Sequence, residues 1–177
     1  MPVKARVGRL RKRSATKVQA ATRAKPRREQ SEKRPLWTCP ACGHRFVTRN
    51  MWHSCRRYPL SYFFKNKDPV VRQLFDQYLA LVSEFGPVIM SPVKTGIAFQ
   101  VRVRFAGATP RKRWLSCALW LKRRVDHPLF YRIESVTPRD HIHRFRLTCA
   151  ADLRDKNLKA LLREAYAVGC QEHIYAR

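Results

Sequence analysis

Apolar residues recur at helical spacing in two stretches of the chain. In the first, Asp68-Pro69 places a capping side chain before a proline at the first helical position, and Gly86-Pro87 ends the run. The apolar positions of this stretch are Val71, Leu74, Phe75, Tyr78, Leu79 and Val82. In the second stretch, Asp152 is the expected N-cap and Gly169 the expected end. Its apolar positions are Leu153, Leu158, Leu161, Leu162, Ala165 and Val168. The pattern predicts two amphipathic helices.

Between these helices the pattern changes to the alternation that is typical of strands. From Ile97 to Phe105, apolar residues alternate with small or polar ones, so we expect one strand with a buried face and a wet face. The run from Trp114 to Leu121 is more densely apolar and is predicted to be a central strand, entered from a loop at 107–113. Residues 131–136 and 142–149 are predicted to be two more strands.

The order of these elements predicts the fold class. Helix, about four strands and helix follow one another, and the connections between strands are too short for helical crossovers, so the sheet should be mainly antiparallel. We therefore expect an α+β domain at residues 62–177, with both helices packed on one face of the sheet.

The N-terminal part of the chain is distinguished by its positive charge. The chain has 177 residues, of which 38 are Lys or Arg and 12 are Asp or Glu, for a formal net charge of +26. Residues 1–36 hold 13 of the basic residues, two acids and no aromatic residue, so they cannot bury enough surface to offset the entropy lost on ordering. We expect a disordered basic arm there. A solubilising tail and an organellar transit peptide are the alternatives to an arm that contacts nucleic acid.

Composition also indicates the cellular location of the protein. No apolar run reaches the roughly 18 residues that a membrane-spanning helix needs, and no secretory signal follows the basic start. The six cysteines are too few and too unevenly spaced for a secreted disulfide scaffold. We expect a cytoplasmic protein with no membrane partner.

A small cysteine-containing head is predicted at residues 37–57. Cys39 and Cys42 are separated by two residues and followed by Gly43, which is typical of a zinc knuckle. Together with His53 and Cys55 they make a closed set of four ligands, so we expect one structural Zn²⁺. Trp37 and Phe46 should form most of the apolar core of the head.

Two other interpretations of these residues are less favoured. His44 is a rival fourth ligand, but a ligand directly beside the knuckle turn would close a strained ring. A redox Cys-x-x-Cys motif is expected at the start of a helix within a βαβ pattern, which this region lacks. The remaining cysteines, Cys117, Cys149 and Cys170, are expected to be small buried apolar residues.

The residues of the head and the domain resemble a known family. The similarity lies in the head, in Lys67–Arg72, in Gly86-Pro87, in Val93–Phe99, in Arg104–Gly107 and in Ala151–Tyr166. These segments are similar to a family of uncharacterised bacterial proteins that carry a domain of unknown function behind a small cysteine-containing head. The resemblance covers roughly residues 37–170 and leaves out the arm. It implies a bacterial cytoplasmic protein with an α+β fold, and it implies no established activity and no catalytic residue.

Charge and the zinc head together favour a non-enzymatic protein that binds DNA or RNA. Residues 37–177 still carry +15, from 25 basic and 10 acidic residues. Arg102, Arg104, Arg144 and Arg146 fall on strand faces by alternation and would form one basic surface if the two strands were neighbours. In the arm, we expect contacts to nucleic acid from Arg9, Arg11, Lys12, Arg13, Arg27 and Arg28. No base-reading motif is visible, and no small-molecule substrate is indicated.

Two alternative functions stay open. A metal-dependent nuclease needs carboxylates that converge on a divalent ion, and only Asp126-His127, Glu134 and Asp140-His141 near strand ends are candidates. No phosphate-binding loop or nucleophile elbow is present, so an enzyme is less favoured. A ribosome-associated or protein-interaction factor is the second alternative, and the sequence does not separate it from a nucleic-acid-binding protein.

Overall fold

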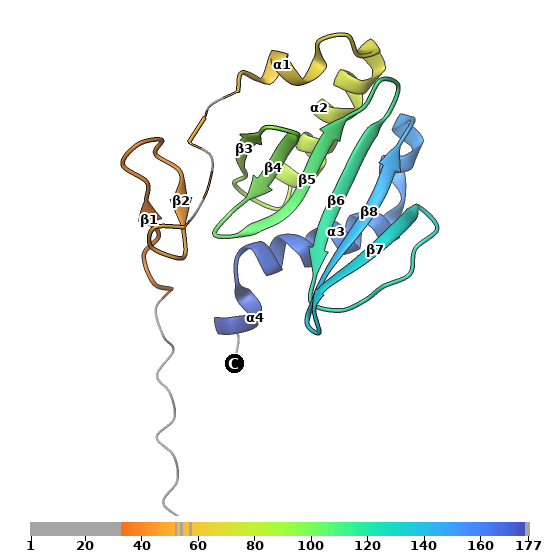
Figure 1. Cartoon of the computed structure of the whole chain (residues 1–177). Coiled ribbons are helices and arrows are strands. Elements are labelled where there is room, and N and C mark those ends of the chain that lie inside the picture. Colours follow the sequence, from red (N-terminus) through yellow and green to blue (C-terminus); the bar gives the residue numbers. More distant parts are fainter. Residues whose placement is uncertain (1–32, 52, 54, 57, 176–177) are drawn as a thin grey trace, which may run out of the picture.

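Six antiparallel strands form the main sheet of the computed structural model, which describes residues 33–51, 53, 55–56 and 58–175. The strand order is β3-β4-β5-β6-β8-β7, as Figure 1 shows. Their bounds are β3 (Ile89–Val93), β4 (Gly96–Gln100), β5 (Arg104–Pro110), β6 (Leu115–Leu121), β7 (Phe130–Thr137) and β8 (Asp140–Leu147). In the head, two short strands pair with each other, β1 (Trp37–Thr38) and β2 (Arg45–Phe46).

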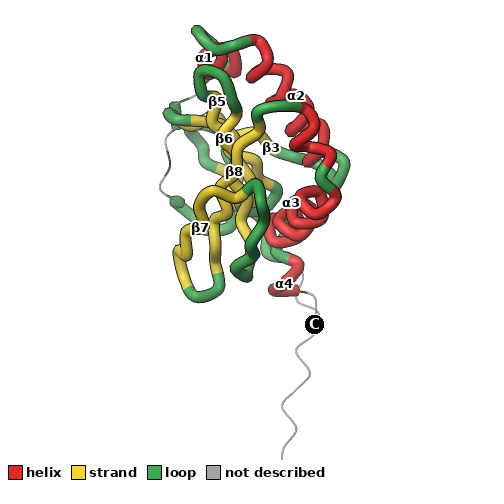
Figure 2. The backbone as a smooth tube through the Cα atoms, turned by 90° about the vertical axis from the view of Figure 1, so that its right-hand side faces the viewer, coloured by secondary structure: helices red, strands yellow, loops and turns green. Residues whose placement is uncertain are grey.

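The longer helices lie on one face of this sheet (Figure 2). The helical elements are α1 (Leu60–Phe64), α2 (Pro69–Ser83), the 3-10 helix η1 (Ala150–Arg154), α3 (Lys156–Gly169) and α4 (Glu172–Tyr175). The core forms where α2 and α3 meet the sheet: the Tyr78 ring lies 5.5 Å from Phe99 and 5.9 Å from Phe145. The α+β class, the antiparallel sheet and the placement of both long helices on one face are confirmed.

The number of strands is six rather than about four. The predicted strand from Ile97 to Phe105 is split at residues 101–103 into β4 and β5, because the backbone N–H groups of Arg102 and Val103 both donate to the Gly169 carbonyl at the end of α3, each at 3.1 Å. Part of the predicted loop at 107–113 belongs to β5. The edge strand β3 was not predicted, since Pro92 weakens its strand signal and is tolerated only because β3 lies at an edge.

The first predicted helix start is confirmed, and the second is wrong by three residues. The Asp68 carboxylate accepts a hydrogen bond from the Val70 N–H at 3.0 Å, with Pro69 at the first helical position. Asp155, not Asp152, caps α3, and it accepts from the Asn157 and Leu158 N–H groups at 2.7 and 3.0 Å. Asp152 instead accepts from Thr148 and Cys149 and supports the separate turn η1.

No helix in the part of the chain that the structure describes is long and apolar enough to cross a membrane.

Candidate metal centre

The first pair of ligands lies on a tight turn between β1 and β2. The Cys39 carbonyl accepts a hydrogen bond from the Gly43 N–H at 2.8 Å, and the Cys39 N–H donates to the His44 carbonyl at 2.8 Å. Gly43 adopts a φ of 73°, the left-handed region that glycine enters without steric cost. The turn therefore brings the Cys39 and Cys42 side chains, both buried, to the same side.

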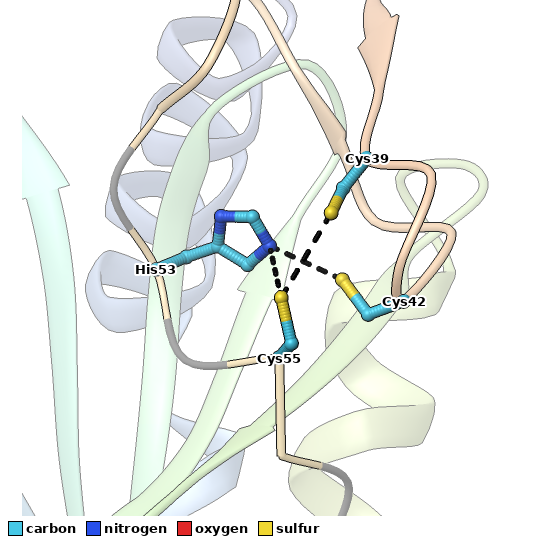
Figure 3. Close-up of side chains that lie close together, drawn as sticks. All are labelled: Cys39, Cys42, His53 and Cys55. Carbon is cyan, nitrogen blue, oxygen red and sulfur yellow. Dashed lines mark hydrogen bonds between the residues drawn. The ribbon is translucent and has the colours of Figure 1, made fainter.

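The second pair of ligands completes a compact cluster (Figure 3). The ligand atoms of Cys39, Cys42, His53 and Cys55 all lie within 4.8 Å of one another. Nε2 of His53 lies 3.1 Å from the sulfur of Cys42 and 3.4 Å from that of Cys55, and the Cys39 and Cys55 sulfurs are 3.9 Å apart.

These separations fit a tetrahedral ion. Zn–S bonds of about 2.3 Å and Zn–N bonds of about 2.0–2.1 Å put the ligand atoms of a tetrahedral zinc site roughly 3.6–3.8 Å apart. The cluster approaches this geometry, so three thiolates and one imidazole could hold a metal ion with no coordination position left for a substrate. Such a closed site stabilises a fold and does no chemistry.

A backbone contact fixes the orientation of the His53 ring. Nδ1 of His53 lies 2.6 Å from the Met51 carbonyl, so it carries the proton and leaves Nε2 facing the three sulfurs. His44, the rival fourth ligand, is not part of the cluster. Its ring packs 6.2 Å from Phe46 and 6.3 Å from His53.

Hydrogen bonds distribute protons unequally among the ligands. The hydrogen bond to Met51 and a second to Cys42 raise the pKa of His53 to about 9. Desolvation opposes ionisation of Cys39, but hydrogen bonds from the backbone of Cys42 and Ala41 outweigh it and lower its pKa to about 6. Desolvation and hydrogen bonds to the neighbouring thiols raise the pKa of Cys55 to about 11. Because a metal ion binds thiolate and neutral imidazole, it must displace the protons of His53 and Cys55.

The head has the expected aromatic core and rests against the domain. Trp37 and Phe46 are paired across β1 and β2 with ring centroids 6.1 Å apart, and the His53 ring lies 4.5 Å from Phe46. The Gln100 side chain on β4 donates to the Arg45 carbonyl at 3.3 Å and is only 8% exposed. The head therefore covers one end of β4.

The candidate nuclease residues do not converge in the described part of the chain, where the Cys/His cluster is the only metal-binding group of three or more side chains. Glu134 pairs with Arg144 at 2.7 Å, and Asp140 pairs with Lys122. The His127 ring contacts Asp155 at 3.4 Å, and His141 contacts Ser135 at 2.9 Å.

The structure separates the arginines that were expected on two neighbouring strands. Arg102 lies in the bend at 101–103, where its side chain donates to Gln171 and to the Arg34 carbonyl. Arg104 is on β5, whereas Arg144 and Arg146 are on β8, and β6 lies between these strands. Arg104 and Arg144 nevertheless line the same hollow above β6. The predicted arm contacts at Arg9, Arg11, Lys12, Arg13, Arg27 and Arg28 lie outside the described residues.

Sequence reasoning missed the aromatic residues beside these arginines. Trp114 and Trp120 point to the sheet face opposite the helices, as do Ser116 and Ala118 between them, whereas Leu115, Cys117, Leu119 and Leu121 enter the core. The alternation was present in the sequence but was hidden by the overall apolar character of the run. Of the other cysteines, Cys117 is buried as expected, Cys170 is half-buried and Cys149 is exposed.

Comparison with known proteins identifies the larger part of the chain. No curated protein and no solved structure matches it. A family described as "Domain of unknown function (DUF5655)" matches residues 61–169, which run from within α1 to the last residue of α3. The match covers more than half of the chain and leaves out the head with its Cys/His cluster. The chain therefore belongs to the DUF5655 family of domains, whose function is unknown.

Proposed function

We propose that this protein binds nucleic acid through its basic surfaces without catalysing a reaction, and that one structural Zn²⁺ holds its head. One observation carries the proposal: most acidic side chains of the domain already bind a helix start or a basic side chain. The surplus basic side chains are therefore left without an acidic partner.

Most carboxylates of the domain have a structural partner. Three support helix starts by accepting backbone N–H groups, namely Asp68, Asp152 and Asp155. Five pair with a basic side chain, namely Asp76, Glu84, Glu134, Asp140 and Glu164. Residues 37–177 contain 25 basic and 10 acidic residues, so many cations are left without a carboxylate. Such a surface attracts polyanions over long range.

The same partners weaken the nuclease alternative. A carboxylate that neutralises an arginine or caps a helix is not placed to hold a divalent ion against a phosphate. The Glu134 pKa is lowered by its hydrogen bond to Arg144, and the Asp140 pKa by its hydrogen bond to Lys122. Both shifts follow from the ion pairs that these two carboxylates form.

The donor set of the head favours zinc among the common metals. Three thiolates and one imidazole in a tetrahedral arrangement suit Zn²⁺, whereas Mg²⁺ and Ca²⁺ prefer oxygen ligands. Because such cysteines must stay reduced to bind a metal, the proposal includes a cytoplasmic location.

The salt dependence of binding tests the proposed function. We expect the full chain to bind labelled DNA and RNA with little sequence preference. On duplex DNA the logarithm of affinity should fall by about 0.9 per phosphate contact for each decade of salt. The variant Arg11→Gln, Lys12→Gln, Arg13→Gln removes three arm charges and should give a shallower slope. Fluorescence anisotropy at several salt concentrations measures both quantities.

A matched control removes three cations that already have carboxylate partners. These are Arg72, Arg123 and Lys159, each changed to Gln. This control should change the slope less than the arm variant. Equal changes in both variants would show that net charge alone drives binding and that the arm makes no specific contribution. Failure of the full chain to bind DNA or RNA at low salt would reject the proposed function. Copurification of a protein after high-salt washing, in place of nucleic acid, would favour the interaction-factor alternative.

A further inference from the structure

One face of the main sheet is left uncovered by α2 and α3, which lie behind the strands in Figure 1 and to one side of them in Figure 2. We call it the open sheet face and define it by the side chains of β5, β6 and β8 that point away from these helices. Solvent-facing sides of antiparallel sheets are usually polar. This one carries several aromatic side chains.

The middle of the open sheet face is a shallow hollow. Its floor is made of small residues that are paired across the strands, Gly107 with Ala118 and Thr109 with Ser116. The hollow has a volume of about 270 Å³ and is bordered by Arg104, Trp120 and Arg144. A Cβ atom at Gly107 would lie 3.3 Å from the Ile97 carbonyl of the neighbouring strand β4, so the glycine keeps the floor low at this position.

Large planar side chains stand around this floor. The Arg146 guanidinium lies 4.8 Å from the Trp114 ring centroid and 4.8 Å from the Tyr131 ring centroid. At the other end of β6, the Arg104 guanidinium lies 5.7 Å from the Trp120 ring. Tyr131 is 45% exposed. The Arg104–Trp120 group therefore lines the hollow, and the group around Arg146 is joined to its floor by the Tyr131 hydroxyl, which lies 3.2 Å from that of Ser116.

The charge of the face matches a polyanion. Arg104 and Arg144 line the hollow, Arg146 lies opposite Ser116 on β8, and Arg132 lies opposite Arg144 on β7. Two acidic side chains of the described residues lie on this side of β7 and β8: Glu134, which both Arg132 and Arg144 contact, and Asp140, which pairs with Lys122. With Lys122 counted, five cations stand against two carboxylates, so the surface is net positive beside the exposed Tyr131 ring and the half-buried Trp114 and Trp120 rings.

We propose that the open sheet face binds single-stranded nucleic acid, with unpaired bases stacked on the aromatic rings and phosphates on the arginines. This inference rests on the proposed nucleic-acid function and adds the class of nucleic acid that the face selects. Bases that are not paired expose their faces to aromatic and guanidinium planes, whereas a duplex hides them. A flat sheet face also cannot enter the groove of a duplex as a helix or a ribbon does.

The length of the face fits a short single strand. Trp120 lies in β6 and Trp114 directly precedes it, six residues away, which corresponds to about 20 Å of extended chain. Nucleotides stacked at about 3.4 Å each would cover that length with roughly six bases. A ten-nucleotide probe is therefore long enough to reach both aromatic groups.

The test uses the full chain and three fluorescein-labelled probes: oligo(U) and oligo(dT) of ten nucleotides, and a ten-base-pair DNA duplex. We expect both single strands to bind more tightly than the duplex and to quench tryptophan fluorescence. Their relative affinities distinguish RNA from DNA. Removal of a stacking ring by Trp120→Leu should weaken single-strand binding at least about fivefold, and Trp120→Phe should restore most of it. Neither variant should change duplex binding as much.

An arginine–aromatic pair away from the open sheet face provides the matched control. Arg163 lies 5.4 Å from the Phe85 ring, and Arg163 belongs to α3, on the helical side of the sheet. The variants Phe85→Leu and Arg163→Gln should leave single-strand affinity within twofold of the parent chain, whereas Arg146→Gln should reduce it. Thermal melts of all variants show whether they fold. If Trp120→Leu does not fold, the single-strand affinities of Arg146→Gln and Arg104→Gln are compared with those of the control variants instead.

The outcomes separate this inference from the proposed function. The inference would be overturned if the chain bound single strands and duplex equally well and if Trp120→Leu and Arg146→Gln bound single strands as tightly as the control variants. General nucleic-acid binding would then remain in place. The inference would also be overturned if polyglutamate displaced the single strand at equal charge concentration, because the face would then select any polyanion. Binding of none of the three probes at low salt would reject both proposals.

Discussion

At the scale of single residues, His143 shows how one buried imidazole affects stability. It is 0% exposed on β8, and its Nε2 atom accepts a hydrogen bond from the Val125 N–H at 3.0 Å, so the ring is neutral with the proton on Nδ1. Desolvation, followed by the positive charge of nearby groups, lowers the pKa of His143. In the unfolded chain the pKa is about 6.5, so below that pH the unfolded state binds more protons than the folded state. Stability should therefore fall as pH falls below 6.5 towards the folded pKa.

The variant His143→Phe tests this residue. Phenylalanine can pack against Phe130, whose ring lies 5.1 Å from that of His143, but it leaves the Val125 N–H without an acceptor. We expect a loss of about 1–3 kcal/mol at pH 7.5 and a weaker pH dependence than in the parent chain between pH 7.5 and 5. Urea unfolding at these pH values gives both free energies. Identical pH dependence in the two proteins would show that His143 does not titrate on unfolding.

At the scale of elements, the Cys/His cluster shows which features of a local sequence predict structure well. The spacing of Cys39, Cys42, His53 and Cys55 was sufficient to predict the cluster, because a knuckle turn is set by a few neighbouring residues and by Gly43. The head packs onto the sheet through Arg45 and Gln100, which are 55 positions apart in the sequence. No local sequence pattern predicts a contact over that separation.

The same contrast explains the errors in the domain. The start of α2 was predicted because Asp68-Pro69 acts within one turn. The split of the strand at 101–103 depends on the Gly169 carbonyl, which comes from the other end of the domain. The order of the strands in the sheet also places Arg104 and Arg144 on either side of β6. The pattern of residues within a single strand does not predict that order. The alternation of apolar and polar residues predicts which side chains of a strand point to the core. It does not predict which strand lies beside it.

Zinc in the head should be stoichiometric, and its binding should release protons. We expect elemental analysis of the purified protein to find one zinc per chain. Cys39→Ser combined with Cys42→Ser should abolish it. The matched control, Cys149→Ser with Cys170→Ser, changes two cysteines outside the cluster and should keep full metal content. Full metal content in the first variant would rule out the assigned ligands.

The proton count follows from the ligand pKa values. At pH 7.5 a pKa of about 9 keeps His53 protonated and one of about 11 keeps Cys55 protonated, while a pKa of about 6 leaves Cys39 ionised. Zinc binding should therefore release at least about two protons, and affinity should rise with pH through this range. Calorimetry in buffers of different ionisation enthalpy measures the release. Zinc affinity that does not change with pH would contradict this proton assignment.

At the scale of the whole molecule, the head and the domain are stabilised by different means. The domain has a continuous apolar core between α2, α3 and the sheet, including Phe75, Phe99, Leu119 and Leu162. The head has two short strands and a few aromatic contacts, which cannot offset the entropy of ordering without a metal. Chelation should therefore unfold the head and leave the domain intact.

We predict that the domain folds without the arm and the head. The predicted boundary at residue 62 needs a small shift, because Tyr58 and Leu60 pack against the core and Phe63 is buried in it. A fragment of residues 58–177 should melt cooperatively. It loses the hydrogen bond from Gln100 to the head, which leaves Gln100 exposed to water and costs about 0.5–1.5 kcal/mol.

The matched comparison is a fragment of residues 65–177, which removes α1 and with it the burial of Phe63. This fragment should be less stable than the first by about 3–5 kcal/mol, the usual cost of emptying a buried phenylalanine site. Calorimetric melting measures both fragments. If residues 58–177 are molten while the full chain melts cooperatively, the head is part of the domain core. The metal would then stabilise the whole molecule rather than its N-terminal part. Because zinc would in that case raise the melting temperature of the sheet as well, chelation of the full chain gives an independent check on the same boundary.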